Sequence, residues 1–312
     1  MTREFDQITW NEQLRDQWRQ LLRLAIREDL GDDGDWTTNA LVPEDVSSEA
    51  WVVAREPGVI AGLPVVEVTL REIEPRLQWT TEVDDGQAVA SGERIGLIEG
   101  PARGILAAER LVLNVLGRLS GIATLTRAYV GAVAGTKARI YDTRKTTPGW
   151  RLLEKYAVRC GGGRNHRTGL HRAVLIKDNH LALGAETTCY TPAEAVERAR
   201  QFAGRRAGEQ MIIEVEVDTL EQLDDVLPAG PDIVLLDNID PAALPEAVTR
   251  RDACNPAIEL EASGGVNLDT VADVARSGVE RISVGALTHS AVGLDLGLDW
   301  SGRHGTLRKG IR

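Results

Sequence analysis

Short apolar segments recur in the second half of the chain, and each one is followed by polar residues. Their later spacing of about 20 to 25 residues, with amphipathic stretches between them, is typical of repeated βα units. Six strands are predicted on this basis, over residues 138–141, 173–176, 212–217, 233–236, 258–262 and 281–284. A seventh is expected near Val158. The pattern favours an α/β fold with an incomplete βα barrel of about seven strands, and an open doubly wound sheet is the alternative.

The first part of the chain has a different pattern. Apolar side chains recur at helical spacing over residues 14–25, and Gly31 is where we expect that helix to end. From 51 to 99, short apolar runs such as 65–68 are broken by Pro and Gly, which predicts strands. A long helix is then predicted over about 105–119. These residues are therefore expected to form a separate, strand-rich domain.

Charge is distributed unevenly along the 312 residues, whose net formal charge is −11. The window 139–180 nevertheless contains ten Lys or Arg residues against three acids, together with three of the five histidines. An acidic protein with one basic region is a poor general nucleic-acid binder but suits a localised anion. A solvated helix face is the alternative, but glycines and strand-like segments interrupt these cations, which favours an anion site.

The cysteines and the hydropathy of the chain indicate in which cellular compartment we expect the protein. Cys160, Cys189 and Cys254 lie far apart, which argues against a disulfide framework or a zinc ribbon. No apolar run approaches the roughly 20 residues needed to span a bilayer, and the first residues do not resemble a signal peptide. We therefore expect a cytoplasmic protein.

Almost every predicted strand of the second half ends in a polar cluster. The clusters are 142–146, 177–180, Glu214 with Glu216, 237–238, Glu261 with 263–265, and 283–285. In βα barrels the chemistry gathers at the carboxyl ends of the strands, whereas the apolar bodies stabilise the fold. This one-sided polarity is the strongest indication of an active site that the residues provide.

Two carboxylates on one strand indicate a metal. Glu214 and Glu216 alternate with valines, so both side chains point to the same face, and Asp237 ends the next strand. Buried carboxylates require cations, and scattered acidic oxygens suit Mg²⁺ shared with substrate phosphates. A solvated acidic strand is the alternative, but the apolar run 233–236 beside it favours burial.

Glycine turns follow the last two strands. Ser263-Gly264-Gly265 stands between a strand and a helix, and Gly285 follows Ser283 at the next strand end. Glycines allow the backbone to approach a phosphate closely, and the last two βα loops of a barrel often bind one.

Lys177 and the glycine-rich loop 161–167 complete the basic region. A lysine at the end of an apolar strand could be a Schiff-base nucleophile. The surrounding cations instead favour phosphate or carboxylate binding, and His166 beside Arg167 after three glycines suits ligand contact.

Five collinear motifs resemble quinolinate phosphoribosyltransferases. They are 142–149 (DTRKTTPG), 161–167 (GGGRNHR), 176–180 (IKDNH), 235–238 (LLDN) and 261–265 (EASGG). Further similarity at 28–38 and 109–121 extends the resemblance from about residue 20 to 290. The function that it implies is transfer of phosphoribosyl from phosphoribosyl pyrophosphate to quinolinate with decarboxylation, which gives nicotinate mononucleotide for NAD biosynthesis.

The resemblance also implies an architecture and a set of site residues. An N-terminal α/β sandwich domain would cover 1–118, with the tail 290–312 packing on it, and the barrel would cover 119–289. The active form would be a homodimer or higher homo-oligomer, in which Arg110 is donated across the interface. The implied quinolinate contacts are Arg144, His166, Arg167 and Lys177. The implied catalytic residues are Lys145, Lys177, Glu216 and Asp237, of which the two acids would also meet Mg²⁺. The implied phosphate cradle is Ser263, Gly264, Gly265, Gly285 and His289.

Three other functions remain open at this point. A related phosphoribosyltransferase could act on nicotinate or another small anion, although four cationic residues (Arg110, Arg144, His166 and Arg167) favour two carboxylates over one. A Schiff-base lyase would use Lys177 and could be trapped with borohydride. A non-catalytic anion-binding protein is disfavoured by the many polar strand ends.

Overall fold

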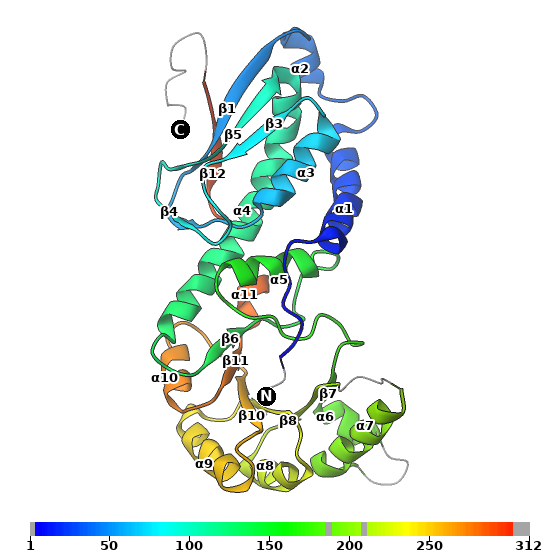
Figure 1. Ribbon diagram of the computed structural model, residues 1–312, viewed down its shortest axis with the longest axis vertical. Coiled ribbons are helices and arrows are strands. Elements are labelled where there is room, and N and C mark those ends of the chain that lie inside the picture. The colour runs from blue at the N-terminus through cyan, green and yellow to red at the C-terminus, as the bar shows by residue number, and fades with distance from the viewer. Residues whose placement is uncertain (1–3, 185–188, 207–210, 302–312) are drawn as a thin grey trace. The chain divides into compact units, whose positions relative to one another are not determined.

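The computed structural model describes residues 4–184, 189–206 and 211–301 (Figure 1). The chain forms two compact units, each built from separate segments. The parallel-sheet unit contains the described residues of 1–7, 128–146 and 163–289, and the antiparallel-sheet unit contains 8–127, 147–162 and the described part of the tail. The end of the predicted tail, 302–312, lies outside the described residues. No helix in the described ranges is long and apolar enough to cross a membrane.

The antiparallel-sheet unit packs helices on a four-stranded sheet. The sheet order is β12 (Leu296–Trp300), β1 (Ser47–Ala54), β5 (Arg94–Pro101) and β3 (Gln78–Thr81), and β2 (Gly58–Val59) pairs separately with β4 (Ala88–Val89). The helices are α1 (Glu12–Leu30), α2 (Trp36–Leu41), α3 (Leu63–Ile73), α5 (Arg151–Cys160) and most of α4 (Ala102–Ala132). The strand at the end of the chain thus joins the sheet beside β1.

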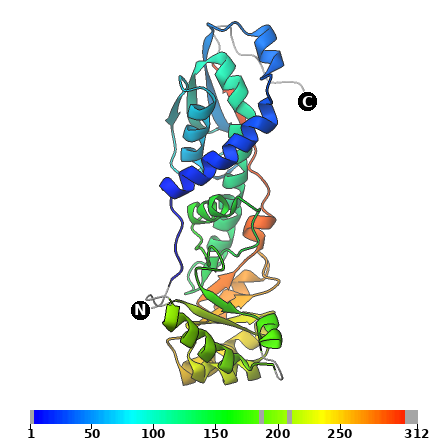
Figure 2. The same ribbon diagram turned by 90° about the vertical axis from the view of Figure 1, so that its right-hand side faces the viewer.

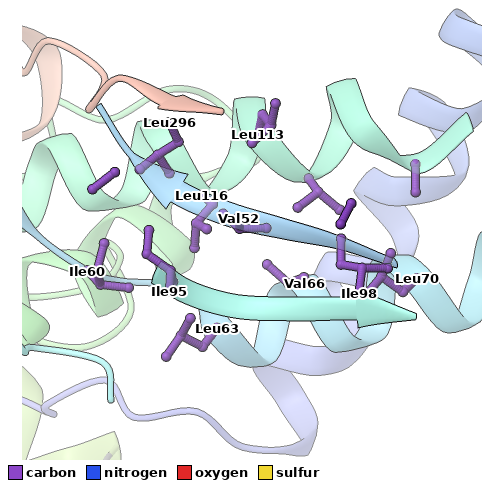
Figure 3. Close-up of a cluster of buried hydrophobic side chains, with 14 of the residues drawn as sticks. Val52, Ile60, Leu63, Val66, Leu70, Ile95, Ile98, Leu113, Leu116 and Leu296 are labelled. Atoms are coloured by element: carbon purple, nitrogen blue, oxygen red, sulfur yellow. The ribbon is translucent and has the colours of Figure 1, made fainter. Parts of the chain in front are cut away.

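One apolar core holds this unit together. Figure 3 shows side chains from strands β1 and β5 meeting side chains from helices α3 and α4. Val52, Ile98 and Leu116 are fully buried within it. Each such side chain contributes roughly 1.5–3 kcal/mol by leaving water, so the core is the main source of stability here.

The predicted helix near the start of the chain is confirmed as α1. Asn11 caps it by accepting a hydrogen bond from the Leu14 backbone N–H at 2.9 Å. Gly31 follows the helix with a φ of 56°, in the left-handed region that favours glycine. The predicted long helix is also present, but α4 is longer than the range 105–119.

Two predicted strands are wrong. The run 65–68 lies in helix α3, which begins after Gly62 with Pro64 in its first turn. Leu63, Val66 and Leu70 are its core side chains, so the helical period overrides the strand preference of its valines. Val158 lies in helix α5, where it is buried beside Ala157.

The six strands predicted in the second half of the chain are confirmed and form one parallel sheet. Its order is β6 (Arg139–Tyr141), β11 (Arg281–Ser283), β10 (Glu259–Ser263), β9 (Ile233–Asp237), β8 (Ile213–Val217) and β7 (Val174–Ile176). Figure 1 and Figure 2 show helices outside this sheet: α7 (Pro192–Arg206), α8 (Leu220–Val226), α9 (Leu244–Cys254) and α10 (Val271–Arg276). Two short helices, α6 (Asp178–Leu183) and α11 (Ala286–His289), follow β7 and β11.

The parallel sheet does not close into a barrel. Strands β6 and β7 stand at the two ends of its order, and beyond β6 the described chain adds only an isolated parallel bridge between Tyr141 and Arg164. The predicted fold class is confirmed in this form: an α/β chain with an incomplete barrel and a separate N-terminal sheet domain.

Candidate active site

The carboxyl ends of the parallel strands surround a pocket of about 550 Å³. The register explains why they meet, because Ser263 of β10 lies opposite Asp237 of β9, and Glu216 of β8 lies opposite Leu235. The predicted residues that line the pocket are Arg144, Lys145, His166, Arg167, Lys177, Glu216, Asp237, Ser263, Gly264 and Gly265. The fold therefore brings ten predicted site residues to one place.

The three remaining predicted residues lie elsewhere. Gly285 and His289 adjoin Lys145, because a Cβ on Gly285 would stand 3.0 Å from Lys145 Cδ and 3.1 Å from His289 Nε2. Arg110 is an exposed residue of α4 in the antiparallel-sheet unit.

Four polar residues line the pocket although no role was predicted for them: Thr143, Asn238, Glu261 and Ser283. Each belongs to one of the predicted polar clusters at a strand end, so that signal did mark them as part of the site without assigning them individual roles. Asn238 is also the described non-glycine residue with a positive φ, at 54°. This conformation is uncommon outside glycine, and asparagine tolerates it better than most residues.

The loop 164–167 is anchored to β6 before it reaches the pocket. The backbone of Arg164 accepts from the Asp142 N–H at 3.0 Å and donates to the Ile140 carbonyl at 2.8 Å. The buried Asp142 carboxylate then accepts from Asn165 Nδ2 at 2.7 Å and from the His166 N–H at 2.8 Å. His166 and Arg167 are therefore presented by a hydrogen-bonded scaffold.

His166 is buried, with both ring nitrogens engaged. Its Nδ1 accepts the Arg167 backbone N–H at 2.8 Å, and its Nε2 lies 2.9 Å from Glu214 and 3.5 Å from Glu261. Burial by itself would lower the pKa of His166, but the charges of Glu214 and Glu261 raise it above its ordinary value. The ring thus favours a positive charge beside the pocket.

Two arginines, Arg144 and Arg167, make one side of the pocket strongly positive. Arg167 is 5% exposed and donates to the Ala173 carbonyl at 3.1 Å. Burial, followed by the charge of Arg144, lowers the pKa of Arg167. The Nε atoms of both arginines are buried and have no hydrogen-bond partner within the described chain. Two neighbouring guanidinium groups that line one pocket suit a ligand with more than one carboxylate, because a guanidinium can donate paired N–H bonds to a planar carboxylate.

An acidic side of the pocket faces Lys177. Lys177 Nζ forms an ion pair with the largely buried carboxylate of Glu216. Burial raises the pKa of Glu216, the hydrogen bond from Lys177 opposes that shift, and the charge of Asp237 adds to it. The carboxylates of Glu216 and Asp237 are therefore near enough to repel each other, which is a setting that a cation would relieve.

The turn after β10 has a shape that glycine alone fits. Gly264 has a φ of +95° and Gly265 a φ of +60°. A Cβ on Gly264 would lie 2.1 Å from Asn238 Oδ1, which is closer than any side chain tolerates. Gly264 therefore lets the turn pack directly against Asn238, whereas a Cβ on Gly265 would meet nothing within 4 Å.

One buried group has the spacing of a metal site. Within the described ranges, ligand atoms of His166, Glu214 and Glu261 lie within 4.8 Å of one another. Cations already balance these acids, because Nε of the fully buried Arg281 donates to Glu261 at 2.8 Å and His166 Nε2 faces Glu214. We interpret this group as an internal charge network beneath the pocket.

The fold and the pocket define a class of protein: an α/β protein with an incomplete barrel and, at its strand ends, a pocket whose several cations suit a multiply charged anion. The family models for the N-terminal and C-terminal domains of quinolinate phosphoribosyl transferase match residues 35–120 and 122–299. The chain belongs to the quinolinate phosphoribosyltransferase family.

Individual relatives agree with this assignment. The chain is 46% identical to a nicotinate-nucleotide pyrophosphorylase [carboxylating] of Mycobacterium leprae, over 90% of this chain and 96% of that protein. It is 42% identical to a probable enzyme of the same name from Bacillus subtilis, over 91% and 93% of the two chains. The structure of the nicotinate-nucleotide pyrophosphorylase from Francisella tularensis superposes with a TM-score of 0.86 at 35% identity, covering 95% of this chain and 99% of that one.

Proposed function

We propose that this protein transfers a phosphoribosyl group from phosphoribosyl pyrophosphate to quinolinate and releases pyrophosphate and CO₂. The product is nicotinate mononucleotide, so the reaction belongs to NAD biosynthesis. The observation that supports this most directly is the pairing of Arg144 and Arg167, two neighbouring guanidinium groups that line one pocket in a chain of this family. A substrate with two planar carboxylates satisfies such donors.

Quinolinate would occupy the basic side of the pocket. Arg144 and Arg167 suit its carboxylates, and His166 places further positive charge beside them. Lys177 reaches the same space while paired with Glu216. These contacts would orient the pyridine nitrogen toward the ribosyl carbon, which lowers the entropic part of the barrier.

Phosphoribosyl pyrophosphate would occupy the opposite side. Ser263, Gly264 and Gly265 would hold the 5-phosphate through backbone N–H groups, with Gly285 and His289 adjoining. Lys145 would contact the pyrophosphate and neutralise the charge that develops as it leaves.

The residues present fit Mg²⁺. Glu216 and Asp237 are oxygen donors that repel each other, and Mg²⁺ is commonly bound through one or two carboxylates together with substrate phosphates. When bound, the ion would neutralise the leaving pyrophosphate. The two carboxylates could contact the ion directly or through water.

The chain's own groups then account for the chemistry. Loss of pyrophosphate leaves a cation-like ribosyl carbon, which the carboxylate of Glu216 or Asp237 stabilises. Attack by the pyridine nitrogen makes the ring positive, so the adjacent charged nitrogen stabilises the electron pair that CO₂ leaves on the ring carbon, and this carbon then takes a proton from water. No covalent enzyme intermediate is required.

A homodimer would complete the site. In the proposed assembly, Arg110 of one protomer contacts quinolinate bound to its partner, which suits the exposure of this residue on α4. A cytoplasmic location, supported by three free cysteines, is part of the same proposal.

The competing functions differ in what the pocket must hold. A nicotinate-specific enzyme would leave one arginine without a carboxylate. A Schiff-base lyase needs a desolvated amine, whereas the side chain of Lys177 is 44% exposed and paired with Glu216.

The deciding assay incubates the protein with phosphoribosyl pyrophosphate, Mg²⁺ and either quinolinate or nicotinate. We expect nicotinate mononucleotide and CO₂ from quinolinate, and no product from nicotinate. Turnover of nicotinate alone would keep the phosphate site but refute the dicarboxylate assignment. If neither is turned over, borohydride trapping at Lys177 becomes the next test.

A further inference from the structure

The first described residues, Glu4–Gln7, belong to the parallel-sheet unit although they precede helix α1. Figure 1 shows the start of the chain running to the strands of this sheet. The segment lies outside both ranges that match the family models, 35–120 and 122–299. Its contacts are therefore a feature that those models do not describe.

Phe5 is the apolar anchor of the segment. It is 5% exposed and packs with Ala173, Ile212 and Ile233 at the bases of β7, β8 and β9. Its ring stacks on the imidazole of His166, with centroids 4.4 Å apart and an interplanar angle of 30°. One face of a pocket-lining residue is thus covered by Phe5.

Glu4 ties the segment to cations under the pocket. Its carboxylate accepts from the Tyr141 hydroxyl at 2.9 Å and from Arg164 Nη1 at 2.9 Å. The guanidinium of Arg281 lies 3.5 Å from Glu4 and 5.0 Å from the centre of the Phe5 ring. Arg281 in turn bonds Glu261, which lies beside His166.

Gln7 fixes the backbone next to His166. Its side-chain amide donates to the Asn165 carbonyl at 3.1 Å and accepts from the Asn165 N–H at 2.9 Å. These two hydrogen bonds satisfy both backbone groups of Asn165, the residue that precedes His166, as pairing with a neighbouring strand would. The backbone next to His166, the face of its ring and the charge network beside it are therefore all contacted by three residues of this segment, Glu4, Phe5 and Gln7.

We infer that Glu4–Gln7 is a positioning segment for the quinolinate side of the active site, with Phe5 holding the His166 ring and the adjoining Arg167 in their binding orientation. The inference rests on the proposed function. The three sets of contacts converge on the loop 164–167, whereas the phosphate cradle is formed by the turns after β10 and β11. Loss of the segment should therefore weaken quinolinate binding selectively.

The matched pair of variants is Phe5→Ala and Ile212→Ala. Both remove apolar volume from the same buried cluster, but Phe5 is the member that stacks on His166. We expect Phe5→Ala to raise the calorimetric Kd and the KM for quinolinate about tenfold, with the KM for phosphoribosyl pyrophosphate changing less than about twofold. Ile212→Ala should lower the melting temperature while leaving the Kd for quinolinate near the wild-type value.

Equal loss of quinolinate affinity in both variants would overturn the inference, because general loosening would then suffice. Wild-type affinity in Phe5→Ala would overturn it too. If Phe5→Ala does not fold, Phe5→Leu keeps most of the apolar volume without a flat ring. That variant should still raise the Kd for quinolinate about fivefold, and an unchanged Kd would refute the stacking role. Failure of the wild-type protein to bind quinolinate would instead refute the proposed function.

Discussion

At the scale of single residues, charge in the pocket is arranged on two sides. Arg144 and Arg167 repel each other on one side, and Glu216 and Asp237 repel each other on the other. Lys177 bridges toward the acids through its ion pair with Glu216. Ligands of opposite charge would reduce the repulsion within each pair, so we expect the anionic substrates to bind beside the arginines and a cation to bind beside the carboxylates.

Lys145 provides the sharpest test at this scale. Lys145→Ala should lower kcat about 100-fold or more, because it removes a cation proposed to neutralise the leaving pyrophosphate. The measurement is steady-state release of pyrophosphate at saturating quinolinate. Lys137→Ala is the control, since Lys137 belongs to the same unit and pairs with Glu280. Unimpaired turnover by Lys145→Ala would exclude this role.

At the scale of elements, loops acquire their shapes from contacts between neighbouring strand ends. The turn after β10 is shaped by Asn238, whose backbone N–H donates to the Ser263 carbonyl at 2.9 Å. Its side-chain oxygen occupies the space where a Cβ on Gly264 would stand. The strand end at Asn238 and the turn after β10 therefore pack against each other and form one side of the pocket.

Substituting Gly264 should disrupt the packing between these two segments. Gly264→Ala should raise the KM for phosphoribosyl pyrophosphate by at least about tenfold, because the new methyl group displaces Asn238 and the phosphate-binding backbone. Gly135→Ala is the matched control: Gly135 has a similar φ of +84° but has nothing within 4 Å of the added Cβ. An equal effect of both substitutions would show that backbone strain alone is responsible.

The carboxylate of Glu280 should make the stability of the fold depend on pH. Glu280, just before β11, accepts from Arg251 at 2.9 and 3.0 Å and from Lys137 at 2.5 Å. Burial alone would raise the pKa of Glu280, but these hydrogen bonds outweigh it and lower the pKa to about 2. A depressed carboxyl pKa stabilises the fold above the unfolded-state value near 4.5, and that stability is lost as the pH falls toward 2.

Glu280→Gln should therefore cost on the order of 2 kcal/mol of unfolding free energy at neutral pH, because buried Arg251 loses the less exposed of its two anionic partners and keeps Asp252. The difference from wild type should shrink as the pH falls below about 5. Urea unfolding at several pH values measures it. Glu246→Gln removes an exposed partner of Arg250 and should change little. A difference that stays constant with pH would contradict the assignment.

At the scale of the whole molecule, the proposed homodimer makes activity a property of two chains. Arg110→Ala and Lys145→Ala should each be nearly inactive alone. After mixing and subunit exchange, a dimer of one variant with the other would contain one intact site, so random pairing restores about a quarter of wild-type activity. A mixture as inactive as its parts would show that Arg110 acts within its own chain, and an Arg110→Ala variant that is active alone would show that Arg110 has no role. Light scattering on each variant checks that dimers form.

Several features were predictable because their signals are local. The six parallel strands are apolar runs of the right length, and the polar residue that ends each run points to the site because parallel strands share one edge. Helix α1 was recognisable from its period and from Gly31. The run 65–68 was misread because β-branched residues favour strands, whereas Leu63, Val66 and Leu70 face a core at helical spacing.

Local patterns of residues were sufficient to predict the fold class, the motifs of the family and ten of the residues that line the pocket. The tertiary structure alone decided that His166 lies against Glu214 and Glu261, and that Phe5 covers its ring. Glu4 reaches Tyr141 across a sequence separation of 137 residues. Such contacts depend on how distant segments pack, and periodicity or local charge carries no information about packing partners so far apart.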